Sequence, residues 1–143
     1  MDIAFHKKQN LYLLTVSFSV LFALIGFTYN VWRMEVSEEN NTIRTACFEM
    51  LINLSSLEQS IYAAFYDGDE QEGSPRKGWV KVGLLTDLSA LADDAVRDKS
   101  TELKAVWSDS WSTIATSQAS FDKMVSAIDS VRAEIKRLLE SLE

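Results

Sequence analysis

The chain has 143 residues, 47% of them hydrophobic and 24% charged, with a net charge of −7, one histidine and one cysteine. Nucleic acids and anionic lipid surfaces are bound mainly through basic side chains, so this acidic balance argues against both as partners. Only five glycines and one proline interrupt the chain, which favours long helices over a sheet of many strands.

The first predicted element is an apolar helix, because the 24 residues from Gln9 to Trp32 include no charged side chain. A helix of that length spans roughly 36 Å, enough to cross a bilayer core of about 30 Å. The segment is apolar on every face, whereas a helix on a globular protein carries a polar stripe. We therefore predict a transmembrane helix at residues 9–33.

The span is predicted to be an uncleaved signal anchor. Its apolar run exceeds the 7–15 residues of a signal-peptide core, and no A-x-A-like cleavage site follows it. Lys7 and Lys8 precede the span and Arg33 is followed by glutamates, so the positive-inside tendency favours a cytoplasmic tail at residues 1–8. Residues 34–143 would then form one exported (periplasmic-type) domain, anchored by a single pass in the inner (cytoplasmic) membrane.

A seven-residue repeat follows the span with no glycine or proline before Gly68. Such a 3-4 alternation of apolar positions is the seam of a helix in a bundle or coiled coil. Its two positions are filled by Val36, Ile43, Met50, Leu57 and Ala64, and by Asn40, Cys47, Leu54 and Ile61. The pattern predicts that the anchor helix continues to about Tyr66, with Cys47 in its buried seam.

The stretch DGDEQEGSP, which begins at Asp67, predicts a polar loop. Its D-x-D-x-Q spacing is similar to the start of a calcium loop. However, Glu72 stands where that loop needs glycine, and Gly78 stands where it needs a bidentate glutamate. We therefore expect a solvated connection and no metal site.

Ser74 and Pro75 predict the start of a second helix, with a hydroxyl cap and proline at the first helical position. The helix is predicted to run to Val96, and the segment DDAVRDKS to form a turn. Gly78 and Gly83 lie within the helix, where they are interpreted as sites of close packing against another helix, the alternative being a flexible flap. Its apolar side consists of Trp79, Val82, Leu85, Leu88, Leu91 and Ala95.

The last segment, from Thr101 to Leu142, contains no glycine or proline and carries about six heptads. One position holds Trp107, Ile114, Phe121, Ile128, Ile135 and Leu142, and the other holds Leu103, Ser110, Ser117, Met124, Val131 and Leu138. The unbroken spacing favours one long helix, although the serines and threonines between Ser108 and Ser120 allow a break. The predicted fold is thus all-α: one transmembrane helix continuing into an antiparallel bundle of three long helices, or four with the break.

The residue pattern predicts no enzyme and no cofactor. His6 would lie across the membrane from the hydroxyls of the domain, so no serine–histidine pair can form. No H-x-x-x-H, C-x-x-C or phosphate-loop spacing occurs. The adjacent carboxylates of Asp93 and Asp94 are interpreted as solvated groups at a helix end. We therefore expect no catalytic, cofactor or metal residues.

Aromatic residues are the remaining candidates for contact with a ligand or a partner. The candidates are Tyr62, Phe65, Tyr66, Trp79, Trp107 and Trp111. Large rings most often fill a core, but Trp and Tyr are also enriched at binding surfaces. Nearby Arg76, Lys77 and Lys81 could hold a carboxylate or form a solvated face.

These features lead us to expect a membrane-anchored, non-enzymatic interaction protein, a small accessory subunit or adaptor of a cell-envelope complex. Its partner would be another protein or further copies of itself, and not nucleic acid. One alternative is a ligand-binding or sensory module that signals through a partner. Another is a phage-type lysis or antiholin-like factor, which has the same layout.

Overall fold

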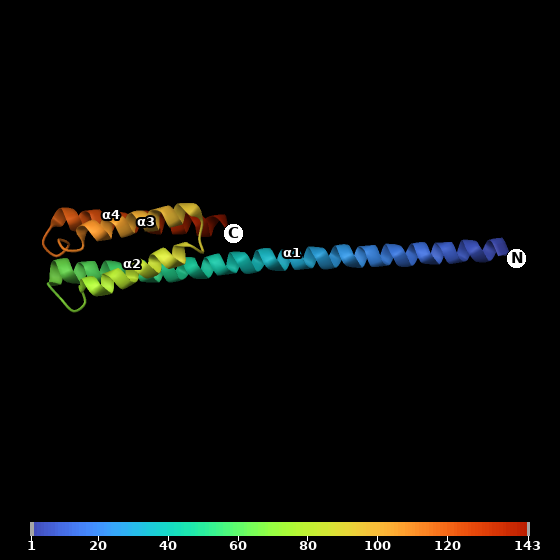
Figure 1. The fold of residues 1–143 in the computed structure, drawn as a ribbon, viewed down its shortest axis with the longest axis horizontal. Coiled ribbons are helices and arrows are strands. Elements are labelled where there is room, and N and C mark those ends of the chain that lie inside the picture. The colour runs from blue at the N-terminus through green and yellow to red at the C-terminus, as the bar shows by residue number, and fades with distance from the viewer. Residues whose placement is uncertain (1, 143) are drawn as a thin grey trace. The chain divides into compact units, whose positions relative to one another are not determined.

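The computed structural model describes residues 2–142, with side chains from Tyr12 onward. All regular structure in this range is helical, so the predicted all-α fold class is confirmed. Figure 1 labels the four α-helices. The elements are α1 (Asp2–Tyr62), the π-helical turn η1 (Ala63–Asp67), α2 (Pro75–Ser89), α3 (Asp94–Ser110) and α4 (Gln118–Ser141).

The chain divides into two compact units, Met1–Glu39 and Asn40–Glu143, and α1 contributes residues to both. Helix α1 carries one segment long and apolar enough to cross a membrane, and none of that segment is buried within the structure. It is thereby unlike the core helix of a globular protein. The side chains of Lys7, Lys8 and the histidine of the predicted tail lie outside the described residues. The backbone at residues 2–8, predicted as a tail, is helical.

Two hydroxyl groups within the apolar segment bond to its own backbone. Ser19 Oγ donates to the carbonyl of Thr15 at 2.9 Å. Thr28 Oγ1 donates to the carbonyl of Leu24, also at 2.9 Å. Both hydroxyls have hydrogen-bond acceptors inside the helix, so both would keep an acceptor in an apolar environment.

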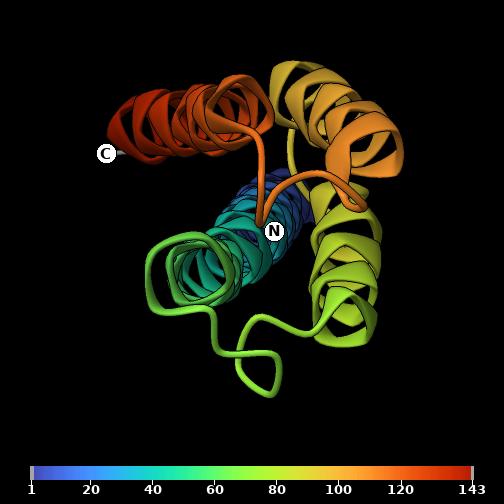
Figure 2. The same ribbon diagram turned by 90° about the vertical axis from the view of Figure 1, so that its left-hand side faces the viewer.

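The second unit, Asn40–Glu143, is called the helical domain below. Within it the end of α1 and helices α2, α3 and α4 lie side by side, and consecutive helices run in opposite directions (Figures 1 and 2). All four contribute to one buried cluster of apolar side chains. Its largest fully buried members are Met50, Leu54, Leu57 and Ile61 of α1, Val82 and Leu85 of α2, Val96 and Leu103 of α3, and Met124, Ile128, Val131 and Ile135 of α4.

The predicted seam of α1 is confirmed between Cys47 and Ile61, where every seam side chain is at most 1% exposed. Cys47 itself is fully buried. Burial raises the pKa of its thiol, and the carboxylate of Asp93 raises it further. Because the thiolate is the reactive form, these conditions suit a core cysteine rather than a reactive one.

The second helix ends at Ser89, so its predicted extension to Val96 is wrong. Asp93 Oδ1 accepts a hydrogen bond from the backbone N–H of Val96 at 2.9 Å and thereby caps α3. The predicted turn DDAVRDKS is therefore the cap and first turns of a new helix. Asp94, in the first turn of α3, is also favourably placed for the helix dipole.

The predicted single helix from Thr101 to Leu142 is also wrong, because it is interrupted between α3 and α4. Thr113 Oγ1 lies 2.8 Å from Ser120 Oγ, and Ser117 Oγ accepts from the backbone N–H of Ser120 at 3.3 Å. These hydroxyls offer the backbone an alternative to the helical ladder. The connection is seven residues long, 111–117, so the heptad spacing continues across it.

Polar contacts join α1 to the helices on either side of it. Arg132 of α4 pairs with Glu58 at 2.6 Å, and both side chains are largely buried. On the other side, Lys81 Nζ of α2 donates to the carbonyl of Ser56 at 2.8 Å and to Ser60 Oγ at 2.6 Å. Burial lowers the pKa of Lys81.

The two glycines of α2 have different surroundings. A Cβ added at Gly78 would lie 2.0 Å from Cη2 of Trp107, so α2 approaches α3 closely at this point. A Cβ added at Gly83 would have no atom within 4 Å. The interpretation as close packing is therefore confirmed for Gly78 and wrong for Gly83.

This difference predicts opposite effects of the same substitution. Gly78→Ala should destabilise the domain by about 1–3 kcal/mol, because the methyl group collides with the buried indole. Gly83→Ala should stabilise it by about 0.5–1 kcal/mol, because alanine favours the helix and the site is open. Thermal unfolding of the full-length protein, followed by circular dichroism, measures both. Equal shifts in the same direction would contradict the close contact with Trp107.

Candidate functional site

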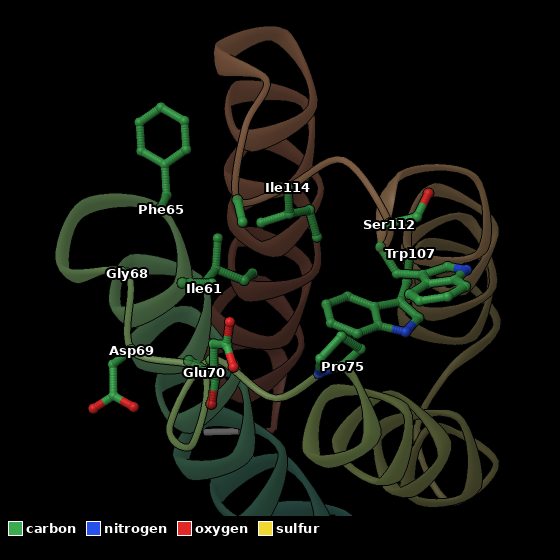
Figure 3. Close-up of a pocket in the computed structure, with 14 residues that line it drawn as sticks. Ile61, Phe65, Gly68, Asp69, Glu70, Pro75, Trp107, Ser112 and Ile114 are labelled. Carbon is green, nitrogen blue, oxygen red and sulfur yellow. The ribbon is translucent and has the colours of Figure 1, made fainter.

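A cavity of about 600 Å³ lies where the C-terminal end of α1 meets the end of α3. Three of the six predicted aromatic contact residues line it: Phe65, Trp107 and Trp111. The rest of the wall comes from residues 60, 61 and 64, from the connection between η1 and α2, from Pro75 and from residues 112, 114 and 115 (Figure 3). This volume falls within the range of small-molecule sites.

The other three predicted aromatic residues lie outside the cavity lining. Tyr62 and Tyr66 stack on each other with centroids 5.8 Å apart, and each meets Phe121 edge-on at 5.4 Å. Phe65 stacks on Phe121 at 4.6 Å and meets Tyr66 edge-on at 4.9 Å. These four rings form an aromatic cluster. Phe121, its member from α4, was not among the predicted contact residues, although its heptad position predicted that it is buried.

Trp79 meets Trp107 edge-on, with ring centroids 6.3 Å apart. Trp107 is only 4% exposed, whereas Trp111 is 42% exposed. Trp107 Nε1 is buried without a hydrogen-bond partner in the described part of the chain. The unsatisfied N–H costs about 1–3 kcal/mol, which packing of the large ring offsets.

The connection before α2 is shaped by a π-helical turn and two glycines. Helix α1 ends in η1, and Gly68 follows with φ of 61°, a conformation suited to glycine. At Gly73 a Cβ would lie 2.6 Å from Cβ of Ala64, so the chain folds back directly against η1. Both glycines line the cavity. Their small size therefore helps to determine its shape.

Two carboxylates of this connection border the cavity and point in different directions. Figure 3 shows the carboxylate of Glu70 turned toward the middle of the cavity and that of Asp69 turned outward. Asp69 Oδ1 accepts hydrogen bonds from the backbone N–H groups of Glu72 at 3.0 Å and Gln71 at 2.8 Å. Both hydrogen bonds lower the pKa of Asp69, and the bond from the Glu72 N–H has the larger effect. Sequence analysis had treated both carboxylates as part of a solvated loop.

The basic residues considered as carboxylate binders do not line this cavity. Lys77 pairs with Glu72 at 2.9 Å, and Lys81 contacts the backbone and hydroxyl groups of α1 described above. Arg76 and Lys77 line a separate, shallow depression on the connection. The charged residues that line the cavity are therefore both acidic.

Within the described residues, no group of three or more His, Cys, Asp or Glu side chains is placed to hold a metal ion. The cavity offers aromatic faces, carboxylates and the hydroxyls of Ser60 and Ser112, a set suited to binding. No protein-family model, curated protein or solved structure matches this chain. Functional inference therefore depends on the geometry itself.

The bonds to Asp69 predict a pH-dependent contribution to stability. Its pKa is lowered on folding, so the stabilisation is present above the ordinary value of 3.8 and is lost as pH falls through the folded value. Asp69→Ala should lower the melting temperature at about pH 7 and have a smaller effect at about pH 2.5. Asp67→Ala removes a carboxylate from the adjacent end of η1 and controls for charge. An equal effect of Asp69→Ala at both pH values would contradict this role.

Proposed function

We propose that the protein is a single-pass membrane protein whose helical domain is exported and acts by binding rather than by catalysis. The exposed, apolar segment of α1 supports the anchor. The basic residues before the span support a cytoplasmic N-terminus by the positive-inside tendency. The domain holds itself together by apolar packing with its one cysteine buried, which suits an exported domain without an internal disulfide.

Membrane topology provides the first test. The full-length chain should remain in the membrane fraction after extraction with alkaline carbonate. In spheroplasts of a Gram-negative host, added protease should remove a tag placed after the last residue and spare a tag at the N-terminus. Lysed spheroplasts, in which both tags are accessible, serve as the control. Release by carbonate, or protection of the C-terminal tag alone, would contradict the proposal.

The leading candidate function is that of an adaptor, a small subunit that docks on another protein of a cell-envelope complex. The observation that carries it is a pair of exposed apolar side chains on α1, Phe48 at 57% and Ile52 at 65%. They are four residues apart and so share one helix face, away from buried Cys47 and Leu54. Solvated single apolar residues are common, but groups of them mark protein interaction sites.

A second exposed pair on α2 extends this surface. Val80 is 69% exposed and Leu84 is 47% exposed. Asn53, next to Ile52, donates to the carbonyl of Lys81, next to Val80, at 3.1 Å. The two pairs are thus on neighbouring helices at the same level. We propose that this surface receives an apolar helix of another membrane protein.

Position-specific photo-crosslinking in native membranes tests the docking surface. A photoreactive residue at Phe48 or Ile52 should capture one defined membrane protein. The same residue at Ser130, partly exposed on α4, should not. Phe48→Ser combined with Ile52→Ser should abolish co-purification of that protein while leaving the helical content unchanged. Crosslinks only between two copies of this chain, or equal capture from Ser130, would overturn the adaptor function.

A second candidate function is favoured by the cavity. Its volume of about 600 Å³ and its two tryptophans suit a ligand-binding or sensory module that signals through a partner. The cavity is in the helical domain and is lined by residues other than those of the docking surface. The two candidate functions are therefore separable by mutation.

A further inference from the structure

We propose that the cavity binds a small organic cation, a quaternary or fully substituted ammonium group carried on a small apolar body. This inference rests on the second candidate function, ligand binding, and names the chemical class of the ligand. It is independent of the adaptor surface on α1 and α2.

The first argument is the aromatic wall. Trp107 and Trp111 both line the cavity and are one helical turn apart at the end of α3. The face of an indole ring carries a negative quadrupole and attracts a cation held within about 6 Å. Tryptophan is the strongest of the aromatic residues in this role. Trp111 remains 42% exposed, so it has surface that a ligand can cover.

The second argument is the sign of the charge. The carboxylate of Glu70 is turned toward the middle of the cavity, opposite Trp107 (Figure 3). Asp69 also lines the cavity, and no lysine, arginine or histidine is among the residues that line it. A concave site bordered by charges of one sign attracts ligands of the opposite sign.

Basic groups lie close to the cavity but outside its lining. Arg76 and Lys77 line, with Glu70, the separate depression on the connection. The ammonium group of Lys81 lies 2.6 Å from Ser60 Oγ, on α1, and 2.8 Å from the carbonyl of Ser56. The ammonium group of Lys77 lies 2.9 Å from a carboxylate oxygen of Glu72. Neither side chain lines the cavity and neither neutralises Glu70 directly.

The same features disfavour other ligand classes. An anion would meet Glu70 and Asp69 with no basic side chain in the lining to compensate. A bare metal ion needs several oxygen, nitrogen or sulfur ligands, and no suitable group occurs in the described residues. A cation with alkyl substituents suits both the tryptophans and the carboxylates of the lining, because its charge is spread over a surface that is itself apolar.

Choline and its uncharged isostere, 3,3-dimethylbutan-1-ol, form a matched pair of probes. The full-length protein is purified in a maltoside detergent, and buffers that contain organic amines are avoided. Choline should bind by calorimetry and quench tryptophan fluorescence, with an affinity roughly tenfold above that of the isostere. Equal affinity for both probes would overturn the cation inference and leave a cavity for neutral ligands. Failure of both to bind would overturn it together with this use of the cavity.

Three variants localise the effect. Glu70→Gln should weaken choline binding about fivefold or more and leave the isostere unaffected. Asp67→Asn removes a nearby carboxylate, at the end of η1, that does not line the cavity, and should change choline affinity by less than about twofold. Trp111→Leu should abolish the fluorescence response. Equal effects of the two carboxylate variants would overturn the assignment of Glu70, and circular dichroism verifies that each variant is folded.

Discussion

The helical domain depends on the contact between Gly78 and Trp107. The indole ring occupies the space that any larger residue on α2 would fill, so this glycine determines how closely α2 approaches α3. The same ring meets Trp79 edge-on and forms part of the cavity wall. One large side chain thus joins the packing of two helices to the shape of the candidate site, at the cost of a buried N–H without a partner. A smaller ring would leave a void at the junction.

Heptad spacing predicted the buried positions correctly where the helices pack, because it reports which face of a helix is apolar. Val36, in the first unit, is instead 41% exposed. Met50 and Leu57 on α1, and Ile128 and Ile135 on α4, are fully buried as their spacing requires. Spacing alone does not determine where a helix stops. The ends are set by local hydrogen bonds, in which Asp93 and Ser117 offer side-chain oxygens to backbone N–H groups. The seven-residue length of the connection between α3 and α4 concealed the break, because the repeat continued through it.

The residue types of the candidate site could be predicted from the sequence, but their partners could not. Aromatic residues at the end of α1 and in α3 were identified, and three of them line the cavity. The contact of Phe65 with Phe121 joins positions far apart in the chain and depends on the break that the sequence analysis did not favour. The inward orientation of Glu70 depends on the connection through which η1, Gly68 and Gly73 return the chain against α1. Residue spacing predicts neither the contact between Phe65 and Phe121 nor the orientation of Glu70.

The electrostatic character of the cavity follows from pairing and not from composition. Near the start of α2 the sequence contains three basic residues, which suggested a site for a carboxylate. In the structure, Glu72 pairs with Lys77, and the hydrogen bonds of Lys81 draw it toward α1. The carboxylate of Glu70 is turned toward the middle of the cavity, on the side opposite Trp107 (Figure 3). A carboxylate and the face of an indole ring are both negative, so where they border one cavity their contributions reinforce each other toward a cation.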